Sequence, residues 1–492
     1  MALIPLSGSQ LTGAGGGPSR QDPPGATDPT DATDPTDATD LPGAIEGAIP
    51  TAVHALLATL WAADHAAFVV GGSLRDVILE RRPADWDLAS DARPDRLVEL
   101  FPGAVYENRF GTVAVRRDGE VFEITTFRTD HDYADFRRPH RIEFGDSIDL
   151  DLARRDFTVN AMAWGAGPGE PPAFIDPYGG LADARAGILR AVGDPRARFE
   201  EDALRMIRAV RLAATLGFGV EAATLAGIQA RADLVAHLSG ERIAAEFDKL
   251  LGAPTPSVGL RLLSDTDLLE SISPELAAQR GVPQNKVPGE DLWDHTLRSV
   301  DAASAARPVV RLAALLHDIG KPATFADGHF VGHDAVGAEL AGAFLDRLRS
   351  PRAVRERVVE LVRHHMFSYE SNWSDAAVRR FIGRMAKLGD GALDELLALR
   401  EADNIGSGLP PMSGQLDELR ARITAELAAE LVLDRSGLAL DGADLMSELG
   451  LEQGPLLGRI LDELLEQVIS DPALNDRPTL LLLAQAMLTE DR

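Results

Sequence analysis

Asp85 and Asp87, in the segment DWD, are separated by a single residue. Residues two apart on a β-strand project from the same face. Two carboxylates on one face repel each other unless a cation lies between them, so this pair suits Mg²⁺. Two such ions can activate a hydroxyl nucleophile and stabilise a departing pyrophosphate. The alternative is a solvated loop in which both carboxylates face water.

A glycine turn precedes this pair. The segment GGSLRD begins at Gly71, follows the apolar run FVV and opens a predicted helix. Glycines at a helix N-terminus let backbone amides approach a phosphate, which makes Gly72 a candidate phosphate contact. Glu123, in the β-rich run VFEITTF, is a candidate third carboxylate from a neighbouring strand. Alternatively, Glu123 faces water at the edge of the sheet.

The order GGSLRD followed by DWD resembles the opening motif of the bacterial-type (class II) CCA-adding enzymes and poly(A) polymerases. These enzymes belong to the polymerase β-like nucleotidyltransferase superfamily. The resemblance implies that Asp85, Asp87 and Glu123 are catalytic and that the two aspartates bind Mg²⁺. It also implies that Gly72 and Arg75 contact the nucleotide.

A second motif, RRDFTVNA, begins at Arg154. An arginine fork holds phosphate oxygens, and Asp and Asn side chains form hydrogen bonds with ribose hydroxyls. The segment resembles the motif with which the family selects ribonucleotides, and this resemblance makes Arg155 a nucleotide contact. The alternative is an Arg–Asp surface pair that caps a helix.

A third motif, EDALR, begins at Glu201 and is predicted to lie on a helix, where residues three apart are neighbours. Asp202 accepts hydrogen bonds and Arg205 donates them, so together they present a complementary edge to a base. In the family this pair selects the incoming CTP or ATP, and Arg208 and Arg211 match further nucleotide contacts. The alternative is a row of ion pairs on a solvated helix.

Histidines and aspartates recur in the second half of the chain. They are His295, His317-Asp318, His333, His364-His365 and Asp403. Clustered His and Asp side chains suit a divalent metal. The order resembles the HD phosphohydrolase superfamily, which implies a metal core of His295, His317, Asp318 and Asp403. Alternatively, the histidines pack between the helices of an inactive domain.

The elements that must hold these residues predict an α+β fold. A small polymerase β-like head precedes an all-helical neck, an HD domain and a C-terminal helical region. The predicted ranges are 1–44 for a disordered acidic tail with TDATDP repeats, 45–180 for the head, 181–285 for the neck, 286–410 for the HD domain and 411–492 for the C-terminal region.

Composition restricts the chemistry further. The chain has no cysteine, which excludes disulfides and thiolate metal sites. It has no apolar run as long as the roughly 18 residues of a membrane span and no apparent secretory signal, so we expect a cytoplasmic protein without a membrane partner. The net charge of −28 argues against a nucleic-acid partner, but an acidic tail contributes to that sum.

Together these features predict the template-independent addition or repair of the 3′-terminal CCA of tRNA from CTP and ATP with Mg²⁺. Poly(A) polymerase activity and addition of only C or only A remain alternatives. Phe136 stands where family members often have glycine in a flexible loop, which puts the switch from C to A in doubt. A different alternative is an HD phosphohydrolase whose head only binds RNA. The metal of the HD domain is left open.

Overall fold

The computed structural model describes residues 41–106, 111–131, 141–284, 286–429, 432 and 434–490, and for residues 129–131, 141, 142 and 490 only the backbone is described. The chain divides into two compact units with a boundary between Leu238 and Ser239. The predicted neck, 181–285, therefore contributes residues to both units. Most of the predicted tail lies outside the described residues, but helix α1 (Leu41–Ala48) begins earlier than predicted. Its Ile45 is fully buried in the core of the first unit.

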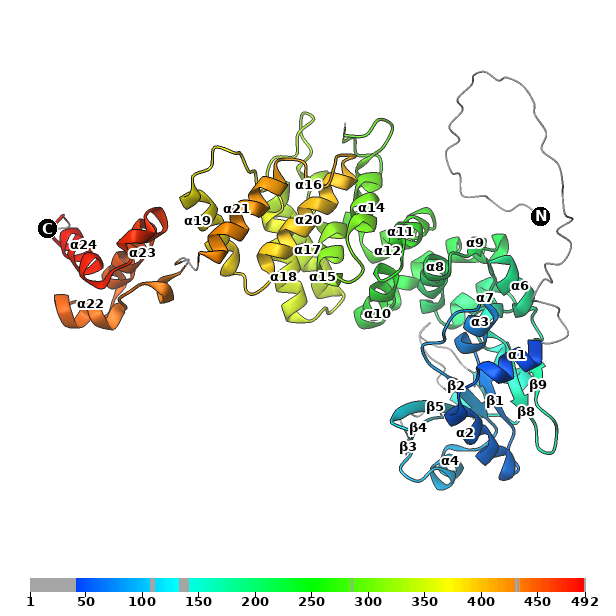
Figure 1. Ribbon diagram of the computed structural model, residues 1–492. Helices are drawn as coiled ribbons and strands as arrows, with labels where there is room; N and C mark the ends of the chain where they lie inside the picture. Colours follow the sequence, from blue (N-terminus) through cyan, green and yellow to red (C-terminus); the bar gives the residue numbers. More distant parts are fainter. Residues whose placement is uncertain are drawn as a thin grey trace, which may run out of the picture. The chain divides into compact units, whose positions relative to one another are not determined.

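A mixed seven-stranded sheet organises the first unit (Figure 1). The strand order is β3-β4-β5-β2-β1-β8-β9, and of these neighbours only β2 and β5 run parallel. The strands are β1 (Ala67–Val70), β2 (Asp87–Ser90), β3 (Val105–Tyr106), β4 (Thr112–Arg117), β5 (Glu120–Thr126), β8 (Ala163–Ala166) and β9 (Ala173–Ile175). Strands β6 (Arg128–His131) and β7 (Arg141–Phe144) pair antiparallel in a separate two-stranded sheet.

Alternating side chains of the central strands supply two apolar clusters. Leu88 and Ile124 pack in one cluster with α2 (Thr51–Ala62), whose buried side chains include Leu56 and Leu60. Phe68, Val70 and Ala89 belong to the other cluster, together with Leu152 of α5 (Ile148–Ala153). Because the strand period is two, burial on both faces fixes the register of these strands. The register in turn fixes where their polar ends lie.

Helices complete the first unit. They are α3 (Gly72–Ile78), α4 (Pro94–Leu100), α6 (Gly180–Ala186), α7 (Pro195–Glu201), α8 (Leu204–Leu216) and α9 (Ala222–Gln229), with short 3-10 segments at Thr158–Asn160 and Ala232–His237. The segment predicted as an all-helical neck also holds one short parallel pair, β10 (Ile188–Leu189) with β11 (Gly219–Val220).

The described residues of the second unit form helices without a β-strand. They are α10 (Gly240–Leu251), α11 (Pro256–Asp265), α12 (Leu268–Ile272), α13 (Pro274–Ala277), α14 (Leu292–Ala302), α15 (Pro308–Leu316), α16 (Lys321–Thr324), α17 (His333–Arg347), α18 (Arg352–His364), α19 (Asp375–Ala386), α20 (Ala392–Gly406), α21 (Leu416–Ala428), α22 (Gly442–Leu449), α23 (Pro455–Ser470) and α24 (Arg477–Glu490). Helices α14, α15, α18 and α20 pack against one another and α17 packs on α18, whereas α22–α24 share a separate apolar cluster.

The α+β prediction is confirmed. Among the described residues no single helix is long and apolar enough to cross a membrane; α1 and α2 reach the required length and composition only as a pair bent by 106°. Val53 and Leu57 of α2 are fully buried in the core of the first unit.

Candidate active sites

The glycine turn brings the backbone against two of the predicted site residues. Gly71 caps α3 with φ +81°, a conformation that favours glycine. A Cβ atom added there would lie 3.0 Å from Arg155 Nη1 and 4.0 Å from Asp87 Oδ2. The turn, the arginine of the second motif and the carboxylate of β2 therefore meet at one point.

Two of the three predicted catalytic carboxylates lie at neighbouring positions of the sheet and the third precedes it. We call the three residues Asp85, Asp87 and Glu123 the acidic site. Asp87 is the first residue of β2 and pairs in parallel register with Glu123 of β5. Trp86 packs toward the apolar cluster of α2. Asp85 precedes β2, so the prediction that both aspartates lie on the strand is wrong. The register places Glu123 beside Asp87 on the next strand rather than at a sheet edge.

The electrostatics of Asp87 reflect this crowding. Asp87 is exposed overall. The protein nevertheless displaces water around its carboxyl, and this desolvation is the main reason why the pKa of Asp87 lies above the usual value. The negative charge of Asp85 raises the pKa further, and the positive charges of Arg155 and Arg208 only partly offset the rise. A divalent cation between the carboxylates would relieve the repulsion that raises this pKa. Because all these donors are carboxylate oxygens, the acidic site fits Mg²⁺.

The second motif is organised around a buried carboxylate. The Asp151 side chain is 1% exposed and accepts hydrogen bonds from Arg154 Nη2 at 2.5 Å and Arg155 Nη2 at 3.1 Å. Burial opposes ionisation of Asp151, but the two guanidinium groups outweigh it and lower its pKa. Asp151 thus holds Arg155 beside the acidic site.

Asp156, which the sequence suggested only as a hydrogen-bond partner of ribose, connects two motifs. It accepts hydrogen bonds from Asn160 Nδ2 at 3.1 Å and Arg208 Nε at 2.9 Å. Asn160 Oδ1 in turn accepts from Arg75 Nη1 at 2.6 Å. Burial of Asp156 is outweighed by Arg208, Asn160 and Arg205, which lower its pKa to about 2. A chain of four side chains, Arg75–Asn160–Asp156–Arg208, therefore joins the glycine turn to α8. Arg75 also bonds Asp76, so its guanidinium is largely engaged within the protein.

The pKa of Asp156 gives a prediction on acid stability. It is about 2 in the folded protein against a usual 3.8, so the unfolded chain binds a proton first as the pH falls. The stabilisation is present above about pH 4 and disappears as the pH falls through about 2. We expect Asp156→Asn to lower the free energy of unfolding by roughly 2 kcal/mol at pH 7, with the difference from wild type shrinking toward pH 2.

Urea unfolding at a series of pH values measures this difference. The matched control is Asp146→Asn, because the Asp146 side chain is 82% exposed and pairs only at the surface with Arg93. Exposed pairs contribute little to stability. A deficit for Asp156→Asn that stays constant with pH would show that the carboxylate charge is not the stabilising feature.

The third motif is not one continuous helix, which corrects the prediction. Helix α7 ends at Glu201, Asp202 has extended backbone, and α8 begins at Leu204. Asp202 Oδ1 accepts a hydrogen bond from the Leu204 backbone at 3.1 Å. The Arg205 guanidinium bonds Glu201 at 2.5 Å and the Arg154 carbonyl at 2.9 Å. Asp202 therefore lies at a break between helices, and Arg205 joins that break to the second motif.

Arg208 and Arg211 both lie on α8. Arg208 pairs with Asp156 and acts electrostatically on Asp87, which places it near the acidic site. The side chain of Arg211 is half-buried.

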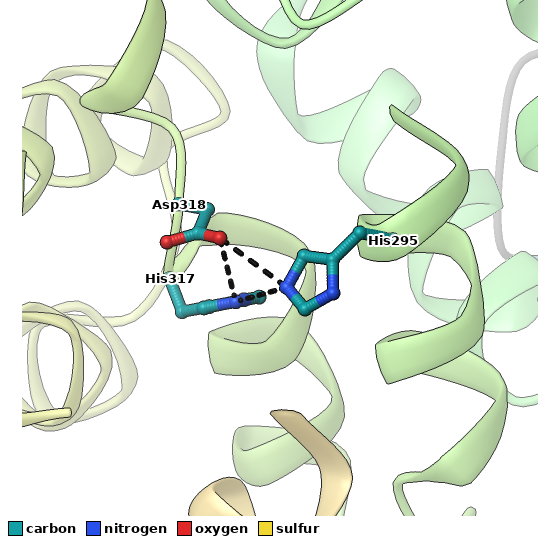
Figure 2. A group of neighbouring side chains, drawn as sticks. All are labelled: His295, His317 and Asp318. Atoms are coloured by element: carbon teal, nitrogen blue, oxygen red, sulfur yellow. Dashed lines mark hydrogen bonds and ion pairs between the residues drawn. The ribbon is translucent and has the colours of Figure 1, made fainter. Parts of the chain in front are cut away.

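The predicted metal ligands of the second unit converge. His295 of α14 and His317 after α15 approach each other with an Nε2–Nε2 distance of 3.1 Å, and each Nε2 lies 3.2 Å from Asp318 Oδ2 (Figure 2). Asp403 Oδ1 of α20 lies 3.4 Å from His295 Nε2 and 3.8 Å from His317 Nε2. All four residues chosen from sequence thus surround one point.

A second group of ligands shares Asp318. Its other oxygen, Oδ1, lies 3.4 Å from His333 Nε2 and 3.6 Å from His365 Nε2, and these two nitrogens are 3.2 Å apart. His333 and His365 were noted in the sequence, but the predicted core did not include them. Asp318 thus faces one pair of histidines with each oxygen. We call the six residues His295, His317, Asp318, His333, His365 and Asp403 the HD site.

Hydrogen bonds orient three of these imidazoles. Nδ1 of His317, His333 and His365 lies 2.8, 2.8 and 2.6 Å from a backbone carbonyl oxygen. A neutral imidazole that donates from Nδ1 carries a lone pair on Nε2. The Nε2 lone pairs of His333 and His365 therefore face each other and repel. A cation between them would turn this repulsion into attraction. Imidazole with carboxylate donors fits a divalent transition metal.

Charges around the HD site favour ionised carboxylates. Burial opposes ionisation of Asp318, but His317 and Lys321 outweigh it and lower its pKa well below the usual range. His317 and Lys286 likewise lower the pKa of Asp403 to about 2 against burial. Burial alone would lower the pKa of His317, but Asp318 and Asp403 raise it.

A pocket of about 570 Å³ opens onto the HD site. Its lining includes Asp318, His333 and Asp403 together with the cations Lys286, Lys321 and Arg400. Phe330, Val331 and Leu409 add apolar surface. Cations beside candidate metal ligands suit an anionic ligand such as a phosphate ester.

The first unit combines a mixed sheet, a glycine turn and adjacent carboxylates, and residues 67–190 match the family model of the Poly A polymerase head domain. Residues 217–280 match the probable RNA and SrmB-binding site of polymerase A, and residues 291–407 match the HD domain. Fold and site define a nucleotidyltransferase.

Comparison over the whole chain identifies the family. The sequence is 33% identical over 449 residues to the CCA-adding enzyme of Streptococcus thermophilus, covering 91% of this chain and 98% of the relative. It is 32% identical over 414 residues to that of Geobacillus stearothermophilus, covering 84% and 90%. The chain belongs to the family of CCA-adding enzymes.

Solved structures agree with this fold. The CCA-adding enzyme of Bacillus stearothermophilus, solved in complex with CTP, superposes with a TM-score of 0.66 at 28% identity, covering 89% of this chain and 98% of that one. The Thermotoga maritima CCA-adding enzyme, solved with tRNA, shares the fold at 19% identity and a TM-score of 0.59.

Proposed function

We propose that this protein adds or repairs the 3′-terminal CCA of tRNA, using CTP and ATP, in the cytoplasm. The observation that carries the proposal is the pairing of Asp87 with Glu123 beside the glycine turn in a chain of this family. The 3′-hydroxyl oxygen attacks the α-phosphorus of the nucleotide, the bond to pyrophosphate breaks, and the hydroxyl proton is released. Mg²⁺ bound at Asp85, Asp87 and Glu123 would activate the attacking 3′-hydroxyl oxygen and stabilise the charge on the departing pyrophosphate oxygen.

The nucleotide contacts divide by chemistry. Arg155 and Arg208, which flank Asp87, neutralise the triphosphate. The backbone at Gly72 approaches it, while Arg75 holds the turn to Asn160. We assign recognition of the base to Asp202 and Arg205 and a further nucleotide contact to Arg211.

The direct test supplies tRNA transcripts ending before CCA, after C and after CC with CTP and ATP separately. We expect C on the first two substrates and a single A on the third. Repeated A on every substrate would instead identify a poly(A) polymerase, and failure with one nucleotide throughout would identify a C-only or A-only enzyme. The loop containing Phe136, which bears on this distinction, lies outside the described residues.

Base selection gives a prediction for the break between α7 and α8. We expect Asp202→Ala to reduce discrimination among CTP, ATP, UTP and GTP roughly tenfold, because the base loses an acceptor worth about 1–3 kcal/mol. Competition among all four nucleotides measures the effect.

Glu200→Ala is the matched control, since Glu200 lies two residues earlier and pairs with Arg231 at 2.5 Å. It should leave selectivity unchanged. A uniformly slower Asp202→Ala enzyme with intact selectivity would assign Asp202 to capping of α8 alone.

The two ligand groups of the HD site favour a second activity. We propose that this domain hydrolyses phosphate esters with bound divalent metal. Water attacks the phosphorus, the ester bond breaks, and the departing alcohol oxygen takes up a proton. The bound metal would supply an activated water and stabilise charge on the phosphate. Hydrolysis of a 2′,3′-cyclic phosphate with Mg²⁺, Mn²⁺, Ni²⁺ or Co²⁺ tests this proposal, and inactivity with all four metals contradicts it.

A further inference from the structure

Lys286 is one of only four lysines in the chain and lies in the pocket of the HD site. Lys286 lies on the segment that precedes α14, and its Nζ is 3.5 Å from Asp403 Oδ1 of α20. The side chain is 33% exposed, so its ammonium group is partly accessible from the pocket.

The other two cations of the pocket are held more firmly. Lys321 Nζ lies 2.6 Å from Asp318 Oδ2, and its side chain is 8% exposed. Arg400 donates to the carbonyl oxygens of His365 and Phe367. Arg400 Nη1 also lies 3.9 Å from Asp403 Oδ2, and the Arg400 side chain is 20% exposed. Lys286, at 33%, is therefore the most accessible cation of the three.

Metal loading changes the charge around Lys286. Asp403 is its counterion in the structure, and the same Asp403 oxygen lies 3.4 Å from His295 Nε2. A cation held by Asp403 and His295 would compete with Lys286 for that carboxylate. The ammonium group then requires another anion, and the pocket beside it is large enough to hold one.

We infer that Lys286 is the residue that holds the phosphate of the substrate in the HD site. It exchanges its contact with Asp403 for one with a phosphate oxygen. A charge-assisted contact of this kind favours a phosphate with two negative charges over one with a single charge. This inference rests on the proposed phosphohydrolase function.

Two binding measurements on the full-length protein test it. Equilibrium dialysis measures Mn²⁺ affinity, and calorimetry with inorganic phosphate measures anion binding to the Mn²⁺-loaded protein. For Lys286→Gln we expect phosphate affinity to fall about tenfold. Mn²⁺ affinity should stay constant or rise, because an ammonium group no longer competes for Asp403. Lys286→Arg should retain most of the phosphate affinity.

Lys387→Gln is the matched control, since Lys387 is an exposed lysine at the end of α19, outside the pocket. It should change neither affinity. If Lys286→Gln loses Mn²⁺ together with phosphate, Lys286 organises the metal ligands and the inference is wrong. Unchanged phosphate affinity also overturns it. If the wild type binds Mn²⁺ but no phosphate, only this inference fails, whereas a wild type that binds no Mn²⁺ overturns the hydrolase proposal as well.

Discussion

Replacing Asp87 with alanine should abolish nucleotide addition, lowering kcat by about a thousandfold or more. Loss of a carboxylate that positions a catalytic metal costs several kcal/mol of transition-state stabilisation, and each 1.36 kcal/mol corresponds to tenfold in rate. Asp85→Ala should act in the same direction. Incorporation of labelled CTP into tRNA that lacks CCA measures the loss, and thermal unfolding checks that the fold is retained.

Glu120→Ala is the matched control for this experiment. Glu120 begins the same strand as Glu123, is exposed, and lies opposite Arg117 at the far end of the β4–β5 pair. The Glu120→Ala variant should add nucleotides as fast as the wild type. Near-normal addition by Asp87→Ala at ordinary Mg²⁺ concentration would remove the acidic site from the reaction.

Replacing Asp318 with alanine should eliminate metal binding at both ligand groups of the HD site. Each oxygen of Asp318 faces a different pair of histidines, so one substitution removes a ligand from both groups. We expect the metal content after dialysis against Mn²⁺ to fall to what the acidic site alone retains, and any phosphohydrolase activity to disappear. CCA addition should persist, because the acidic site has its own carboxylates.

Two histidine variants sharpen this result. His365→Ala should remove only the metal of the group that contains His333. His364→Ala is the control: this adjacent histidine is half-buried and contacts Glu360 at 3.4 Å. It should retain the wild-type metal content. Loss of CCA addition in a folded Asp318→Ala variant would show that the two activities depend on each other.

Sequence periodicity predicted the fold class, and it left open whether Glu123 lies on a strand beside Asp87 or at the edge of the sheet. The β-rich run around Glu123 alternates apolar and polar residues, and burial of the apolar face fixes its register beside β2. The roles of these residues in catalysis remain predictions. For the HD site, the residue types indicated a metal, and the structure brings the four chosen side chains together.

Other features depend on contacts that spacing does not encode. His333 and His365 lie beside Asp318, whereas His364 contacts Glu360. This outcome depends on how α17 and α18 pack around Asp318, and the sequence of either helix alone does not predict it. The break at Asp202 has no glycine or proline to mark it. The sequence suggested that the Asp of the second motif bonds ribose, whereas Asp156 accepts hydrogen bonds from Asn160 and Arg208 within the protein. These two partners lie on different elements, so only the folded chain shows that one buried carboxylate serves both.

The chain Arg75–Asn160–Asp156–Arg208 has an evolutionary consequence. Each inner member satisfies a partner on either side, so replacing one leaves a buried polar group of another without its counterpart. Energies of groups in such a network are not additive. Drift at one of these four positions should therefore be tolerated chiefly alongside a compensating change at another, and the glycine turn and α8 should evolve as a single module even though well over a hundred residues of sequence separate them.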